Sequence, residues 1–167
     1  MSTVTLHAPT TDLRSVFRRA AASTWVVTGA RAPGLDPVGF TAISVVSVSL
    51  DPPLVSFNIG KDSSSLVTLA RTHRAGLHLL ADHQAHLATR FAADRRQRFI
   101  DDGAWHWDHG LPVITGAALH LSTRIVDLVE AGDSFLALAR VEHASSTAHS
   151  PLIHHQGRFA PLHLIGA

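Results

Sequence analysis

Residues 39–58 read Gly-Phe-Thr-Ala-Ile-Ser-Val-Val-Ser-Val-Ser-Leu-Asp-Pro-Pro-Leu-Val-Ser-Phe-Asn, which predicts a strand, a Pro-Pro break and a second strand. The first strand is unusual, because Thr41, Ser44, Ser47 and Ser49 put small hydroxyls on both of its faces. A half-buried strand normally alternates bulky apolar and polar side chains. Small polar side chains beside accessible backbone suit a flat, heteroatom-rich ring such as a flavin. A Ser/Thr-rich edge strand explains the same residues equally well.

Length and composition favour one globular domain of 167 residues, with 46% hydrophobic and 16% charged residues. The formal charge of +1 argues against nucleic acid or a membrane surface as a partner. No cysteine is present, so disulfides, thiolate metal sites and cysteine nucleophiles are excluded. Scattered histidine pairs without further ligands indicate no metal site. No apolar run has the length of a membrane span, and we expect a cytoplasmic protein.

The order of the expected elements favours a mainly β fold with inserted helices. We expect a mobile tail over residues 1–10 and a single domain over residues 11–167. Because strands do not alternate regularly with helices, a small barrel is favoured over a doubly wound sheet. The expected helices cover residues 13–22, 66–70 and 82–92, with a further turn near 95–99; the expected strands cover 24–30, 41–50, 54–59, 75–80, 117–127, 134–143 and 151–164, with a hairpin turn at 130–133 and an irregular segment at 105–111.

A second candidate site is the run Lys61-Asp62-Ser63-Ser64-Ser65 at an expected helix start. Free backbone N–H groups, the helix dipole, serine hydroxyls and the Lys61 ammonium would together hold a phosphate. A simple N-cap with a solvated lysine is the competing interpretation. Neither a Gly-x-Gly-x-x-Gly nor a Gly-Lys-Ser/Thr loop occurs, so a Rossmann or P-loop nucleotide site is unsupported.

Several stretches resemble one known family. They are Phe17-Arg18-Arg19, Gly39-Phe40-Thr41-Ala42-Ile43-Ser44, Ser47-Val48-Ser49-Leu50-Asp51-Pro52-Pro53-Leu54-Val55, Ala88-Thr89-Arg90-Phe91-Ala92, Gly110-Leu111-Pro112, Gly132-Asp133 and Pro151-Leu152-Ile153. Together they resemble the flavin reductase family, the reductase components of two-component flavin-dependent monooxygenases. The resemblance covers roughly residues 13 to 160 and implies an FMN-binding split β-barrel.

The resemblance also implies roles for individual residues. The flavin ring and ribityl chain would contact Thr41, Ala42, Ile43, Ser44, Ser47, Val48 and Ser49; the phosphate would be held by Ser63 and Ser65 with Lys61; and Arg90 and Phe91 would belong to the segment that closes over the flavin. Members of the family are commonly homodimers with flavin near the subunit interface, so a homodimer is expected.

The chain departs from the family pattern on the nicotinamide side. Many relatives have a histidine after the Gly-Asp turn, where this chain has Ser134, and relatives often carry tyrosine near the last strand, where this chain has His154 and His155. Ser134, His154 and His155 are therefore the candidates for contact with the nicotinamide, and no catalytic residue is assigned with certainty.

The resulting first hypothesis is an NAD(P)H-dependent flavin reductase that supplies reduced FMN or FAD to a partner monooxygenase. Hydride passes from the nicotinamide to the flavin, so the cofactors carry the bond making and no catalytic triad is required. Two alternatives remain open at this point. One is a split-barrel flavoprotein acting directly on a small organic substrate, and the other is a non-catalytic protein that binds flavin or haem.

Overall fold

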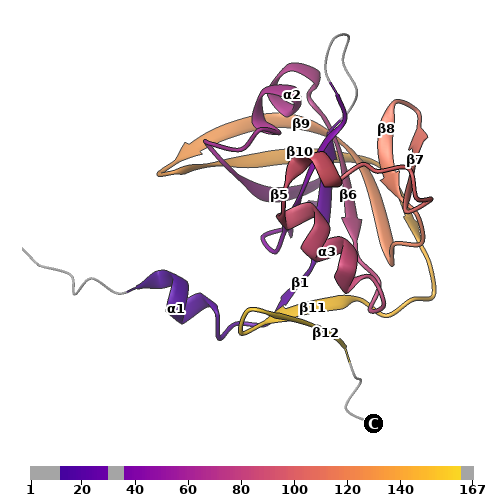
Figure 1. Ribbon diagram of the computed structural model, residues 1–167. Coiled ribbons are helices and arrows are strands. Elements are labelled where there is room, and N and C mark those ends of the chain that lie inside the picture. Colours follow the sequence, from indigo (N-terminus) through magenta and orange to yellow (C-terminus); the bar gives the residue numbers. More distant parts are fainter. Residues whose placement is uncertain (1–11, 30–35, 163–167) are drawn as a thin grey trace, which may run out of the picture.

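The structure is a computed structural model that describes residues 12–29 and 36–162, and most of the described chain is β-strand (Figure 1). The predicted N-terminal tail, residues 1–10, lies outside the described residues. The strands are β1 (Ala22–Ser23), β2 (Trp25–Gly29), β3 (Val38–Ala42), β4 (Val46–Leu50), β5 (Pro53–Gly60), β6 (Arg74–Leu79), β7 (Trp105–Asp108), β8 (Leu111–Ile114), β9 (Leu119–Ala131), β10 (Ser134–Ser146), β11 (Leu152–His155) and β12 (Arg158–Pro161); the helices are α1 (Leu13–Phe17), α2 (Leu66–Thr72), α3 (Ala85–Ala92) and the 3-10 turn η1 (Arg95–Gln97).

Seven strands form the main sheet in the order β3-β2-β6-β9-β10-β5-β4. The strands β3 and β4 follow each other in the chain but lie at opposite edges of this sheet. The sequence-based prediction of one hydroxyl-rich strand over 41–50 is therefore wrong: the strand stops at Ala42 and a new one begins at Val46. The link of residues 43–45 contains neither glycine nor proline, so nothing in the sequence marked the break.

The inner face of the curled sheet holds the larger of the two hydrophobic clusters. Residues of six strands and one residue of α2 point into it, with Phe57 and Leu77 fully buried. A second cluster lies on the outside of β2, where α3 supplies Leu87, Ala88 and Phe91. Thus α3 covers one outer flank of the barrel, as Figure 1 shows.

None of the residues of helix α1 is buried. Asp12 caps it by accepting from the Arg14 N–H at 3.1 Å, but the helix stops at Phe17, well short of the predicted Ala22. An isolated helix of this length gains little from its few backbone bonds. No helix in the described ranges is long and apolar enough to cross a membrane.

The segment predicted to be irregular, 105–111, is instead part of the hairpin β7–β8. Its turn places His109 and Gly110 at φ angles of +46° and +80°. Such a pair of left-handed residues closes a tight two-residue hairpin. The Thr28 hydroxyl donates to the Pro112 carbonyl at 2.7 Å and so ties the hairpin to β2.

The hairpin covers a stacked pair of histidines on the outer face of β6 and β9. The rings of His78 and His120 lie parallel with centroids 4.7 Å apart. His78 is fully buried, and its Nδ1 is 3.1 Å from the Val26 carbonyl. Burial, the neighbouring His120 and the more distant His106 lower the pKa of His78 to about 3, and burial also lowers the pKa of His120. Both imidazoles are therefore neutral in the folded protein near pH 7.

The buried pair predicts acid lability. Unfolded histidine binds its proton below about pH 6.5, whereas folded His78 stays neutral down to about pH 3. Between these values the unfolded state binds more protons, so His78 lowers the unfolding free energy by up to about 1.4 kcal/mol per pH unit as pH falls. When urea unfolding is measured at several pH values, the unfolding free energy of His78→Asn should fall less steeply with decreasing pH than that of wild type.

The matched control for this experiment is His86→Asn, which removes an exposed histidine of α3 and leaves the buried pair intact. Equal pH slopes for wild type and His78→Asn would contradict the assignment of acid lability to His78.

Candidate functional site

A cleft of about 410 Å³ lies where the start of α2 meets β3 and the turn after α3. Ser64 and Ser65 line it from α2, and Phe99 contributes an aromatic wall. Ser65 is fully buried, and its hydroxyl has no hydrogen-bond partner among the described residues. A buried hydroxyl without a partner is costly unless a ligand satisfies it.

Three arginines of the turn after α3 give this cleft its positive charge: Arg95, Arg96 and Arg98. Arg96 is paired with Asp94, and this pairing lowers the pKa of the Asp94 carboxyl to about 2. Arg98 is anchored by bonds to two carbonyls, Gly39 at 2.7 Å and Ala93 at 2.8 Å. The cleft therefore combines fixed positive charge with a hydroxyl that lacks a partner, which is the chemistry of a phosphate site.

The backbone of β3 connects this cleft with the predicted ring-binding segment. Val38 lines the cleft, and the same strand ends at Ala42, where the 43–45 link begins. Gly39 is required between them, because an added Cβ would lie 2.9 Å from the Val27 carbonyl oxygen and 3.0 Å from the Phe91 ring. The strand β3 thus runs from the cleft to the segment predicted to bind the ring.

The predicted ring-binding residues divide into two groups. Some hydroxyls already have protein partners: Thr41 donates to the Ala88 carbonyl at 2.6 Å, and Ser44 accepts from the Asn58 N–H at 3.0 Å. Ala42 is buried in the barrel core. Of the remaining members, Ile43, Ser47 and Val48 are exposed, and Ser49 is half-buried, as Thr41 and Ser44 are.

The predicted phosphate residues are only partly brought together. Ser65 lines the cleft, whereas Ser63 accepts from the Ser65 N–H at 3.3 Å and so shapes the turn. Lys61 turns the other way: its ammonium pairs with Glu130 and lies 5.8 Å from the centre of the Phe135 ring. The structure places Lys61 beside the β9–β10 hairpin rather than in the cleft.

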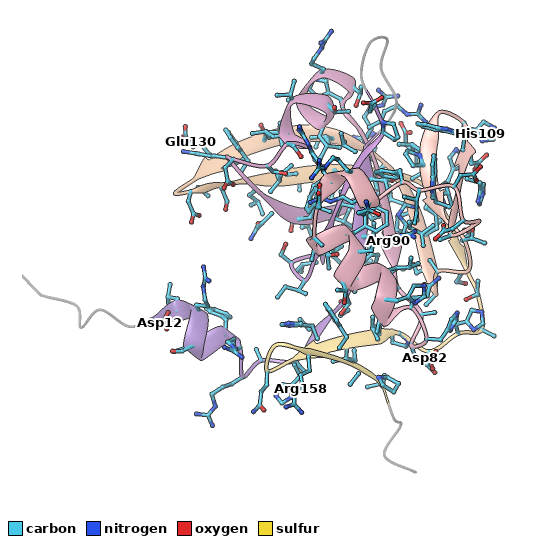
Figure 2. All side chains as sticks on the ribbon, viewed as in Figure 1. Asp12, Asp82, Arg90, His109, Glu130 and Arg158 are labelled. Carbon is cyan, nitrogen blue, oxygen red and sulfur yellow. The ribbon has the colours of Figure 1, made fainter. Side chains whose placement is uncertain are left out.

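Arg90, labelled in Figure 2, and Phe91 both lie on α3. The Arg90 guanidinium pairs with Asp102, and its Nε and Nη2 are buried without partners in the described part of the chain. Phe91 is fully buried, with its ring edge-on to Phe99 at 5.2 Å. Phe91 therefore packs against Phe99, which lines the cleft. Arg90 has two N–H groups that could donate to a ligand.

The three predicted nicotinamide residues lie in two places. Ser134 begins β10 opposite Gly60, and its hydroxyl donates to the Asp133 carboxylate at 3.1 Å. His154 and His155 belong to the separate sheet β1-β11-β12, away from the β9–β10 tip (Figure 1). One chain therefore does not bring Ser134 together with these two histidines.

Sequence reasoning included Ser64 in the candidate phosphate run but missed the three arginines and Phe99. The available signal was the run Arg95-Arg96-Gln97-Arg98-Phe99, in which three cations follow a predicted helix at once. This run matters because it lines the same cleft as the start of α2. Since α2 lies about thirty residues earlier in the chain, the sequence did not predict that the two segments are neighbours.

No three histidine or acidic side chains in the described ranges 12–29 and 36–162 gather closely enough to hold a metal ion.

Comparison with known proteins identifies the class. The model of the flavin reductase like domain matches residues 17–163. The chain is 42% identical over 154 residues to an NADH:FMN oxidoreductase of Rhodococcus erythropolis, covering 89% of this chain and 79% of that protein. It is 29% identical to the reductase component of a 4-nitrophenol 4-monooxygenase/4-nitrocatechol 2-monooxygenase of Rhodococcus opacus, covering 89% of this chain and 78% of that protein.

Among solved structures, the NADH:FAD oxidoreductase SgcE6 of Streptomyces globisporus C-1027, in complex with NAD and FAD fragments, superposes with a TM-score of 0.85 at 33% identity and 93% coverage of both chains. The chain belongs to the flavin reductase family. The predictions of a split-barrel fold and of a nicotinamide-dependent flavin reductase are both confirmed.

Proposed function

We propose that this enzyme releases its reduced flavin to a partner flavin-dependent monooxygenase. The observation that carries the proposal is the family match over residues 17–163, together with a relative that is itself the reductase component of a monooxygenase. We also propose that the enzyme acts in the cytoplasm, where the nicotinamide donor is regenerated. The hydride that the nicotinamide supplies passes to the flavin, so the protein contributes binding and alignment.

The cleft at α2 fits the phosphate end of FMN or FAD. The partnerless hydroxyl of Ser65 matches a phosphate oxygen, and Arg98 keeps a fixed positive charge beside it. The ring would then lie toward the 43–49 segment, where Ser47 and Ser49 present hydroxyls. Thr41 and Ser44, whose hydroxyls already have protein partners, would fix the backbone of this segment rather than bond the ring directly.

Ser134 gives the nicotinamide side a different character from the family pattern. Its short neutral hydroxyl is already bonded to Asp133, so it has little reach toward a second ring. We expect the nicotinamide to be held mainly by stacking on the flavin, and its apparent affinity to be low. His154 and His155 could contact it only from another chain.

The proposed activity is tested by following NADH and NADPH oxidation with and without added FMN or FAD. Turnover should rise with free flavin, because flavin is consumed as a substrate. The reduced flavin should then support an added flavin-dependent monooxygenase. Tightly bound flavin without nicotinamide oxidation would contradict the proposal and favour a flavoprotein acting on its own substrate.

The phosphate assignment predicts a selective loss of affinity in Ser65→Ala. A hydrogen bond to a charged phosphate is worth about 1.5–3 kcal/mol, so FMN affinity measured by calorimetry should fall about 10- to 150-fold. Riboflavin lacks the phosphate and serves as the matched ligand control, with unchanged affinity. An equal loss for both ligands would instead place Ser65 in the ring site or in folding.

We further propose that the chain acts as a homodimer, because large apolar side chains of α1, β4 and the β9–β10 hairpin are exposed. These residues are Leu13, Val16 and Phe17 of α1, Val46, Val48 and Leu50 of β4, and Val126, Val129 and Leu136 of the hairpin. Leu50 alone is 90% exposed. Exposed apolar area of this kind favours a protein partner.

Charge complementarity favours a second copy as the partner. Arg14, Arg18 and Arg19 accompany the apolar stripe of α1, whereas Asp127 and Asp133 flank the hairpin tip. Figure 2 shows Asp12 and Glu130, which mark α1 and the tip, on the same side of the molecule. In a two-fold dimer the basic helix of one chain can therefore meet the acidic hairpin of the other, twice.

The dimer proposal predicts that Leu13→Ser/Phe17→Ser lowers the mass measured by light scattering from dimer to monomer. Neither side chain is buried in its own chain, so the two substitutions should not disturb the packing of the barrel. The dissociated chain should therefore still melt as a folded barrel. Val67→Ser, an exposed apolar residue of α2, is the control and should stay dimeric. A monomeric wild type across micromolar concentrations would contradict the proposal.

A further inference from the structure

A second cleft, of about 500 Å³, opens between the β7–β8 hairpin and the outer face of β6, β9 and β10. It shares no lining residue with the cleft at α2. Figure 2 shows His109, which lines it, on the opposite side of the molecule from Glu130 at the hairpin tip. The cleft therefore lies apart from the flavin site and from the proposed dimer face.

The floor of this cleft is unusually polar for a covered sheet face. Alternation along β9 turns Leu121 into the barrel core and leaves His120 and Ser122 on the outer face. His120 is held in place by its stack on the fully buried His78. The Nε2 atoms of both histidines are buried and lack hydrogen-bond partners within the described ranges. Apolar residues would cover this face at lower cost.

Two arginines, Arg74 and Arg124, lie on this face together with two carboxylates of the cleft, Asp108 and Glu142. Arg74 of β6 lies directly opposite Arg124 of β9, and like charges opposite each other in a sheet are destabilising. Glu142 neutralises Arg124 through a 2.9 Å bond. Arg74 bonds only to the His109 carbonyl, at 3.0 Å, among the contacts that the structure describes, and forms no ion pair there.

We propose that this cleft binds a small organic carboxylate, with the carboxylate on Arg74 and Ser122 and its apolar part between Leu111 and the His120 ring. A guanidinium matches a carboxylate in two parallel hydrogen bonds. The volume of about 500 Å³ suits a ligand of the size of an aromatic acid.

The remaining charges of the cleft favour a monoanion over a dianion. Asp108 and Glu142 both line the cleft: Glu142 is paired with Arg124, whereas the Asp108 carboxylate lies 2.7 Å from Nδ1 of His109, which balances its charge only when the imidazole is protonated. A phosphate dianion would meet two carboxylates for one available guanidinium. A carboxylate needs only the single charge of Arg74.

The test uses the purified full-length chain without added flavin and benzoate as the probe. Imidazole signals of His120 followed by nitrogen–proton NMR should shift and saturate with benzoate. Benzamide, which has the same shape without the charge, should leave them in place. Absence of a His120 shift at millimolar benzoate overturns the proposal. The reductase activity is measured separately, and its outcome does not depend on this result.

Variants locate the charge that the probe recognises. Arg74→Gln should raise the benzoate dissociation constant at least about tenfold, and Arg74→Lys should give an intermediate value because the charge remains and the paired geometry is lost. Arg71→Gln on the exposed side of α2 is the control and should bind as wild type. Unchanged benzoate binding by a folded Arg74→Gln variant overturns the assignment to Arg74. Tighter binding of inorganic phosphate than of benzoate by the wild type overturns the proposal that the ligand is a carboxylate.

Discussion

A three-residue link constrains the whole fold. The strands β3 and β4 occupy the two edges of a seven-stranded sheet, yet only residues 43–45 separate them in the chain. An extended chain from Ala42 to Val46 spans at most about 14 Å. The two sheet edges must therefore curl toward each other, which creates the barrel interior. The same link brings the exposed Ile43 and the half-buried Ser44 to the corner where the edges approach, so closure of the barrel and the shape of the proposed ring site have one cause.

The parts of the fold that the sequence predicted are those with strong local signals. β2 and β5 are short runs of apolar and β-branched residues between turn residues, and the Gly132 turn, at a φ of +62°, joins the two longest strands as predicted. The break after Ala42 was not predicted, because closure of the barrel imposes it and no glycine or proline marks it in the sequence. The β7–β8 hairpin failed for a different reason: its turn uses His109 in a left-handed conformation, which few non-glycine residues adopt.

The site was predictable only where its residues are neighbours in sequence. The Ser63–Ser65 turn was found from its place at a helix start, and Ser65 does lie in the cleft. The arginines after α3 reach the same cleft through tertiary contacts, chiefly the bonds of Arg98 to Gly39 and Ala93. Lys61 illustrates the reverse case, since a lysine at a plausible phosphate position is drawn to Glu130 on another strand. Local pattern identifies candidates, and long-range packing selects among them.

The strand pairing also determines when the chain can fold during synthesis. Ala22 of β1 pairs with His154 of β11, and β5 pairs with β10 more than seventy residues later. Early strands thus leave the ribosome long before their partners, and closure of so many non-local pairs is slow. β2 can pair early with β3 and β6, and β5 with β4, but the second edge of β5 stays unpaired until β10 has emerged. Loss of residues 152–167 would remove β11 and β12 and leave Ala22 and Ser23 without a sheet to join.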